Sequence, residues 1–186
     1  MEKTIENKTN IEYLEVTDLS EIGEGSRVCI DVIDILEPDE GIFVGNTSNG
    51  YVFILSENRQ SASYPPRPFR INVGAVHQYI LLGEKTSYLS DLKPGSKIPV
   101  CKDGGIREVA IGRMKIEKRP FIRLVCKGEG AEISATVQNA ESVCFMEEKR
   151  GVVSIKELHV GDKVRCFKDI AGRHLGERLD EYIYEV

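Results

Sequence analysis

Short apolar runs broken by turn residues constrain the fold of this chain more than any other feature of its sequence. Runs such as "RVCIDVIDIL", "GIFVG" and "YVFIL" are alternating or wholly apolar, and Gly, Pro, Asn or Asp interrupts each of them. This pattern is typical of antiparallel β structure, and helical periodicity is scarce. In "NTSNG", the Asn49-Gly50 pair predicts a hairpin because both residues tolerate positive φ. We therefore predict an all-β fold that contains a meander over residues 27–56.

A recurring turn-strand pattern organises the predicted fold. The segments "SEIGEGSRVCID", "SDLKPGSKIPVCKD" and "KELHVGDKVRCFKD" share an apolar lead-in, a glycine turn and an alternating strand. The turns are Gly25-Ser26, Gly95-Ser96 and Gly161-Asp162, where glycine supplies backbone freedom and Ser or Asp can bond the turn amides. We expect compact antiparallel β-barrel or sandwich units with few helices. They would form one body over residues 11–186, with subdomains 11–88 and 89–186 as an option, behind a disordered tail at residues 1–10.

Composition excludes several functional classes. The net charge of −5 and the absence of a basic block give little basis for binding nucleic acid through phosphate contacts. No apolar run is long enough to span a bilayer, and the amino terminus has no apolar signal-peptide core, so we expect no membrane partner and a cytoplasmic location. The five cysteines are scattered without a C-x-x-C pair, so we predict small buried hydrophobic residues rather than zinc ligands or nucleophiles.

The segment "RPFRINVGAVHQY", residues 67–79, places Arg67, Arg70, Asn72 and His77 among residues that otherwise resemble a buried strand. In a straight strand, Arg70 and Asn72 would share one face and His77 would lie on the other. Gly74-Ala75 is a natural place for a β-bulge, which would bring His77 to the side of Arg70 and Asn72. Arg67 precedes this strand.

A second polar pattern lies in "GRMKIEKRP". Strict alternation predicts one face with Arg113, Lys115, Glu117 and Arg119, and an opposite face with Met114, Ile116 and Lys118. Two interpretations remain open from the residue pattern: a solvated outer face of a sheet, or a pocket for an anionic, oxygen-rich ligand.

Seven blocks in order carry a family resemblance. They are "GSRVCID", "EGIFVGNTSNGYVFILSE", "RPFRINVGAVHQYIL", "TSYLSDLKPG", "IGRMKIEKRP", "ATVQNAESV" and "GRHLG". From about Ile11 to Val186 the sequence resembles the carboxy-terminal half of the archaeal-type, or type II, 3-dehydroquinate synthase family. Leu175 replaces an aromatic residue that is usual in this family. The matching polar positions are Arg67, Arg70, Asn72, His77, Lys115, Glu117, Arg119, Gln138, Asn139, Glu141 and His174.

The resemblance implies an enzyme of aromatic biosynthesis. Such an enzyme oxidatively deaminates a seven-carbon amino keto-sugar acid with NAD and closes it to 3-dehydroquinate; a related branch makes aminohydroxybenzoate and uses a divalent metal. Catalytic roles would fall to His77, Lys115 and Glu117. Metal-ligand candidates are His77, Glu141 and His174. Substrate binding would involve Arg67, Arg70, Asn72, Arg119, Gln138, Asn139 and His174, because a carboxylate and several hydroxyls require cations and amide groups.

The chain departs from the family in length and in its cofactor motif. Family members are about twice as long, and no G-x-G-x-x-G follows a strand in this chain, so NAD is implied by the resemblance only. Three interpretations follow: a chain that partners with a separately encoded amino-terminal half or with its own copies, a shortened enzyme with different chemistry, or a non-catalytic β module that binds a metabolite or a protein.

Overall fold

The computed structural model describes residues 10–169, 173–174, 177–178 and 184–186. Residues 1–9, most of the expected tail, lie outside this part of the chain. The all-β prediction is confirmed, since the only helical element among the described residues is one short 3-10 turn, η3. The elements are β1 (Ile11–Val32), β2 (Gly41–Gly45), β3 (Gly50–Leu55), β4 (Arg70–Ala75), β5 (Tyr79–Leu81), β6 (Thr86–Tyr88), η3 (Leu89–Asp91), β7 (Lys97–Lys102), β8 (Gly105–Gly128), β9 (Ala131–Gln138), β10 (Cys144–Glu147), β11 (Gly151–Ser154), β12 (Lys163–Lys168), β13 (Arg173–His174) and β14 (Glu177–Arg178).

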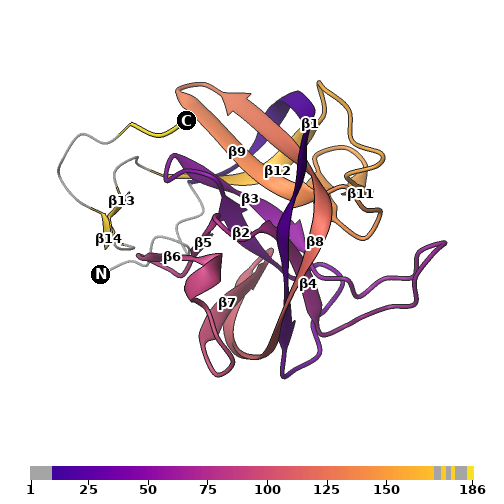
Figure 1. Ribbon diagram of the computed structural model, residues 1–186. Coiled ribbons are helices and arrows are strands. Elements are labelled where there is room, and N and C mark those ends of the chain that lie inside the picture. The colour runs from indigo at the N-terminus through magenta and orange to yellow at the C-terminus, as the bar shows by residue number, and fades with distance from the viewer. Residues whose placement is uncertain (1–9, 170–172, 175–176, 179–183) are drawn as a thin grey trace.

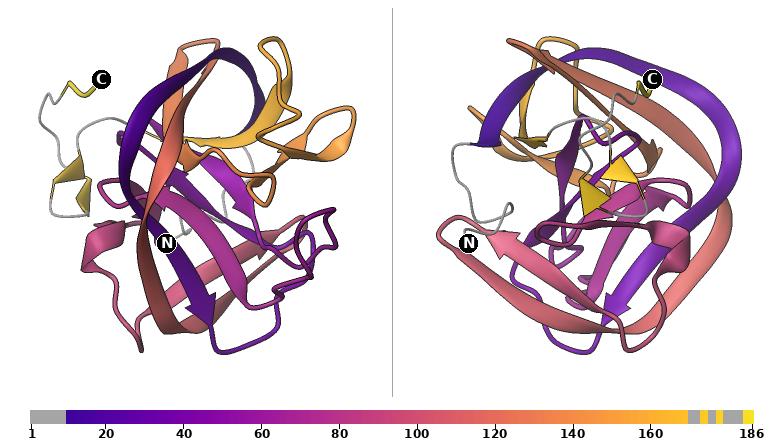
Figure 2. Two further views of the ribbon diagram at one scale, coloured as in Figure 1. Left: turned by 45° about the vertical axis from the view of Figure 1, so that its right-hand side comes forward. Right: turned by 90° about the vertical axis from the view of Figure 1, so that its left-hand side faces the viewer.

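Two long antiparallel strands form the frame of the molecule. β1 has 22 residues and β8 has 24, and they pair along most of their length. Figure 2 shows both strands curving together around the outside of the body. The pairings β1–β8, β8–β7, β7–β2, β2–β3, β3–β12 and β12–β1 close on themselves, so the main sheet forms a ring (Figure 1). Strands from before and after residue 88 therefore share one sheet.

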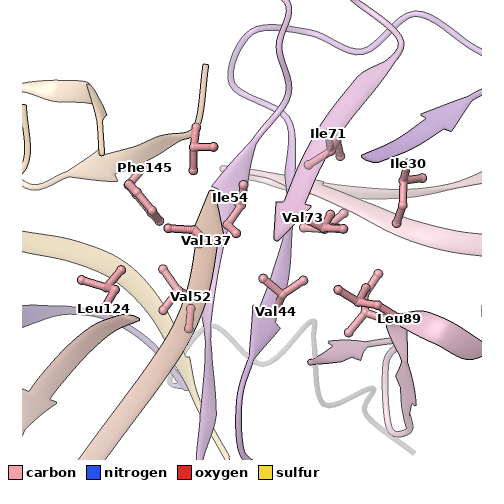
Figure 3. Close-up of a cluster of buried hydrophobic side chains, with 14 of the residues drawn as sticks. Ile30, Val44, Val52, Ile54, Ile71, Val73, Leu89, Leu124, Val137 and Phe145 are labelled. Atoms are coloured by element: carbon pink, nitrogen blue, oxygen red, sulfur yellow. The ribbon is translucent and has the colours of Figure 1, made fainter. Parts of the chain in front are cut away.

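The core explains why the central strands are apolar on both faces. In β2 and β3, Ile42, Val44, Val52 and Ile54 belong to the larger hydrophobic cluster, part of which is shown in Figure 3. Their sequence neighbours, such as Phe43, point to the opposite side and form a second cluster with Phe167. Because side chains alternate across a strand, continuous apolar runs are the expected sequence of strands that are covered on both sides.

Local turn predictions are partly confirmed. β2 and β3 form the predicted hairpin around residues 46–49. The meander over residues 27–56 is wrong, because β1 pairs with β4, β8 and β12 and not with β2. Gly95 and Gly161 have positive φ in the turns before β7 and β12, as the repeat predicts. The repeat fails at Gly25-Ser26, which lies inside β1, where continuous pairing with β8 replaces the turn.

A bulge in β4 sets the position of the polar side chains. Val28 pairs with Gly74 while Cys29 pairs with Asn72, so Val73 is the additional residue on β4. Gly74 has a φ of 88°, and a Cβ at this position would lie 2.2 Å from the carbonyl oxygen of Thr136. Glycine is therefore required both for the backbone conformation and for the close approach of β9. The bulge lies within one residue of the predicted Gly74-Ala75 position.

The burial predicted for the cysteines is confirmed. Each of the five cysteines is free and buried. Burial raises the pKa of the Cys29 thiol to about 11, which disfavours the reactive thiolate. Among the described residues, no helix has the length and apolar character needed to cross a bilayer.

Candidate functional site

Adjacent strands β4, β1 and β8 carry a polar face built from alternate residues. The register places Arg70 beside Asp31 and Asp31 beside Arg113. One step further, Asn72 lies beside Cys29, which in turn lies beside Lys115. Directly opposite residues of antiparallel strands share a face, so alternation along β1 and β8 predicts the rest of this face correctly. We call it the polar face; its members are Arg70, Asn72, Arg27, Cys29, Asp31, Arg113, Lys115, Glu117 and Arg119.

Arg27 and Gln138 connect the strands at the centre of the polar face. The Arg27 Nη1 and the Asn72 Nδ2 both donate to the Oε1 of Gln138, the latter over 2.8 Å. The Arg27 Nη2 donates to the Oε1 of Glu117 over 3.2 Å. Arg27 and Asn72 are both buried. The network therefore joins β4, β1, β8 and the end of β9 through charge-assisted and neutral hydrogen bonds.

Arg27 was not among the predicted site residues. Its signal was present in "RVCID", where Arg27, Cys29 and Asp31 alternate with apolar residues that face the core. Period-two alternation of polar side chains in an otherwise apolar strand is the same signal that identified the face of β8. The sequence alone does not reveal the register between β1 and β8, so the alternation in β1 could not be assigned to the same face as that in β8.

Glu117 organises the exposed edge of the polar face. Its carboxylate contacts Arg119 through Oε2 and the Lys115 Nζ through Oε1, the latter over 3.3 Å. The Lys115 side chain is 48% exposed and that of Arg119 is 39% exposed, so both can meet a ligand from solvent. The hydrogen bond from Lys115, together with the charges of Arg119 and Arg27, holds the pKa of Glu117 below its ordinary value.

Arg67 and Arg70 each hold a buried carboxylate. Arg70 binds Asp31 through two parallel hydrogen bonds of 2.8 and 3.1 Å, and Arg113 adds a third of 2.8 Å. Burial alone would raise the pKa of Asp31, but the hydrogen bonds from Arg70 and Arg113 outweigh it and lower the pKa. Arg67 binds Glu57 over 3.1 Å. Burial raises the pKa of Glu57 despite that bond.

His77 lies beside Asn46, which contacts Ser134 and Thr136 of β9. Its Nε2 is 2.8 Å from the Asn46 Oδ1, which also accepts a hydrogen bond of 2.9 Å from the Thr136 Oγ1. With Asn46 in this orientation, Nε2 carries the proton and Nδ1 is the basic nitrogen of the ring. Burial lowers the pKa of His77, so the ring is neutral near neutral pH. His77 therefore has no contact with Arg70 or Asn72, although Thr136 and Gln138 lie on the same face of β9.

The metal-ligand candidates do not meet in the described part of the chain. Glu141 accepts a hydrogen bond of 3.0 Å from the backbone N–H of Ser63, away from the contacts of His77. The His174 backbone belongs to the short β13, and its side chain lies outside the described residues. No three His, Cys, Asp or Glu side chains gather as metal ligands within the described residues. Within the described residues, His77 and Glu141 therefore do not form a metal site together.

The described residues also lack the usual elements of a dinucleotide site. Bound pyrophosphates commonly lie at a helix N-terminus, and the described ranges contain only the three-residue η3. This part of the chain does not fit NAD, and we derive no step through it.

Asn139 and the nearest large cavity complete the description of the site. Asn139 follows β9, and its backbone N–H donates to the carbonyl of Pro120 over 3.0 Å. A cavity of about 630 Å³ borders the polar face at Asp31 and Arg113 and is otherwise lined by Val32, Ile33, Asp34, Ile35, Phe69 and Gly112. None of the predicted site residues that the structure describes lines this cavity.

Comparisons with known proteins point in one direction. Residues 13–186 match the family model of the 3-dehydroquinate synthase II C-terminal domain. The chain is 42% identical to a 3-dehydroquinate synthase of Methanoculleus marisnigri, over 92% of this chain and 53% of the relative. It is 38% identical to that of Methanopyrus kandleri, over 99% of this chain and 47% of the relative. The chain thus spans about half the length of these relatives. No solved structure matches it.

Proposed function

Because this chain belongs to the 3-dehydroquinate synthase II family, whose carboxy-terminal domain it matches, we propose that its polar face binds the carboxylated amino keto-sugar acid of 3-dehydroquinate synthesis. One observation carries this proposal. Exposed Lys115 and Arg119 lie at the edge of a face whose buried centre is built from amide and guanidinium groups. Cations that are partly exposed can attract a carboxylate, and fixed amides can orient hydroxyl groups.

The contacts favour a division of roles within the proposed site. Lys115 and Arg119 would bind the substrate carboxylate, while Asn72, Gln138 and Asn139 would bind hydroxyls. Arg67 and Arg70 are already paired with Glu57 and Asp31, so we propose that they shape the face rather than grip the substrate. His77 would move protons through Nδ1, since its ring is neutral near neutral pH. Glu117, with its lowered pKa, would stay ionised and hold Lys115 and Arg119 in place.

The cofactor and the partner belong to the same proposal. In this family NAD supplies the oxidising equivalent when it is bound. We propose that an amino-terminal counterpart, of the kind that the full-length relatives contain, holds NAD and completes the enzyme. The half-length coverage of the relatives supports such a partner.

A titration tests whether the polar face binds the proposed class of ligand. We expect 3-dehydroquinate to bind the chain in isothermal titration calorimetry, and Lys115→Gln to weaken binding about tenfold through loss of a charge-assisted hydrogen bond. Lys118→Gln is the matched control: it removes the same charge from an exposed position of β8, but on the opposite face. Equal effects of both substitutions, or no binding, would contradict the proposal and favour a non-catalytic module.

A further inference from the structure

The centre of the polar face contains one donor and one acceptor that lack partners. The Nε of Arg27 and the Oδ1 of Asn72 are both buried, and neither has a hydrogen-bond partner among the described residues. A buried polar atom without a partner loses its hydration and gains no hydrogen bond in return, which destabilises the folded chain. Few buried polar atoms in the described chain lack a partner, and two of them lie in this one network. This indicates that the network is arranged to bind a further polar group.

Both atoms belong to side chains that contact the same oxygen. The Nη1 of Arg27 and the Nδ2 of Asn72 donate to the Oε1 of Gln138. Covalent geometry places Nε two bonds from Nη1, and Oδ1 two bonds from Nδ2. The unpartnered donor and the unpartnered acceptor therefore belong to two side chains that share one contact.

The orientation of these amides follows from chemistry. A guanidinium can only donate, so Gln138 must present its oxygen to Arg27. That same oxygen then requires a donor from Asn72, which must present its nitrogen and leave Oδ1 unused. Reversing either amide would oppose two acceptors or two donors. Arg27 and Asn72 therefore still require one acceptor for the Arg27 Nε and one donor for the Asn72 Oδ1.

A hydroxyl group meets this requirement, because it accepts one hydrogen bond and donates another. A carboxylate would satisfy Nε but would face the Asn72 oxygen with a second acceptor, and an ammonium would fail in the opposite sense. We propose that the Arg27 Nε and the Asn72 Oδ1 form a subsite that selects one hydroxyl group of a polyol carboxylic acid. The proposal rests on the proposed function and adds Arg27 to its binding residues.

The exposure gradient gives this subsite a direction of entry. Side-chain exposure increases from Arg27, at 7%, to Glu117, at 29%, and to Lys115, at 48%. A carboxylate held by Lys115 and Arg119 at the edge would leave a hydroxyl on the same ligand to reach inward past Glu117. The hydroxyl subsite thus provides specificity, and the edge cations provide charge attraction.

A pair of acids that differ in their hydroxyl groups tests the subsite. Quinate is a polyhydroxy cyclohexane carboxylate, and cyclohexanecarboxylate has the same carboxylate and ring without hydroxyls. We expect the full chain to bind quinate at least about tenfold more tightly in calorimetric titration, because the hydroxyl-free acid leaves the buried pair unsatisfied. In Asn72→Leu, which removes Oδ1 with little change of volume, the preference should disappear while binding of cyclohexanecarboxylate is unchanged. Lys115→Gln should weaken both acids equally.

Arg27→Lys is a second variant, since it keeps the positive charge and removes Nε. Thermal melting of each variant identifies those that stay folded, and Arg27→Lys carries the test if Asn72→Leu does not fold. Equal binding of the two acids by the unmodified chain, or a preference that survives both substitutions, would overturn the subsite and leave the carboxylate site standing. Failure of both acids to bind would overturn the proposed function, and the subsite with it.

Discussion

His77 shows at the scale of one residue how partial desolvation shifts the pKa of a side chain that is otherwise exposed. Its Nε2 is tied to Asn46, and burial lowers its pKa from the ordinary value of 6.5. A lowered pKa keeps Nδ1 unprotonated at neutral pH, which suits a base. It also makes folding depend on pH, because the unfolded chain binds the proton more readily than the folded one.

We predict that the free energy of unfolding rises with pH between the folded pKa of His77 and 6.5, and that His77 adds no slope above this window. Below the folded pKa, both states are protonated and the full penalty applies. Denaturant titrations from acidic to neutral pH would measure the slope, and His77→Gln should remove this contribution. An NMR titration of the imidazole should give a midpoint below 6.5; a midpoint above it would contradict the role of burial.

Asp31 is a second residue whose surroundings predict a measurable effect. It is buried between Arg70 and Arg113, and Asp31→Asn would leave the nearly buried Arg70 without its counter-ion. We expect a loss of about 3–5 kcal/mol in the free energy of unfolding, measured by chemical denaturation. Asp34→Asn is the control, because Asp34 is 59% exposed and its partner Arg107 still binds Glu40; its loss should be much smaller than that of Asp31→Asn. Equal losses would contradict this interpretation.

At the scale of an element, a single bulged residue in β4, Val73, determines which way the polar side chains of this strand point. Without the bulge at Val73, one part of the strand would face the opposite way, because side chains alternate with a period of two. The bulge lets Asn72 reach Gln138 while Gly74 passes close to the carbonyl of Thr136 on β9. The site therefore depends on a glycine that has no side chain of its own to place in it.

We predict that Gly74→Ala lowers the free energy of unfolding by more than about 2 kcal/mol, since both a positive φ and a carbonyl 2.2 Å from the new Cβ oppose it. Gly83→Ala is matched in φ, at 96°, but meets nothing within 4 Å, so only the backbone term of about 1 kcal/mol applies. Denaturant unfolding of the two variants measures the difference. Similar losses in the two variants would show that β9 moves away from the new Cβ at position 74 at little cost.

At the scale of the whole molecule, the main issue is that this chain corresponds to half of its relatives. It spans 53% of the Methanoculleus marisnigri protein and 47% of the Methanopyrus kandleri protein. The described residues supply cations, amides and an imidazole, the groups that the proposed binding and deprotonation of a carboxylated sugar would require. They do not fit a dinucleotide, so we assign that task to the amino-terminal counterpart.

We predict little or no NADH formation when this chain alone is given NAD and the amino keto-sugar acid. A chimaera that joins the amino-terminal part of the Methanoculleus marisnigri protein to this chain should form NADH, detected by absorbance, because it combines the proposed cofactor and substrate sites. His77→Ala in the chimaera should suppress the signal. Robust turnover by the lone chain would show that this half also binds the cofactor.

The sequence by itself determined the class of fold and much of its local structure. Alternation predicted the antiparallel strands and the shared face of Lys115 and Glu117. Turn chemistry predicted the β2–β3 hairpin and, to within one residue, the bulge at Val73. These features depend on backbone geometry within a few residues, which the side-chain pattern records directly. Ordered motifs also identified the family, since they match along the chain without reference to its folded form.

Only the tertiary structure decided which polar groups are paired. In the sequence, Arg70 resembled a free substrate ligand, but β1 places Asp31 beside it. Arg27 was not predicted as a site residue, and only the fold brings Gln138 and, through it, Asn72 to it from other strands. The predicted turn at Gly25-Ser26 became part of β1 for the same reason. Partners in a sheet come from strands that lie far apart in the chain, and the order and register of those strands follow from burying the core as a whole.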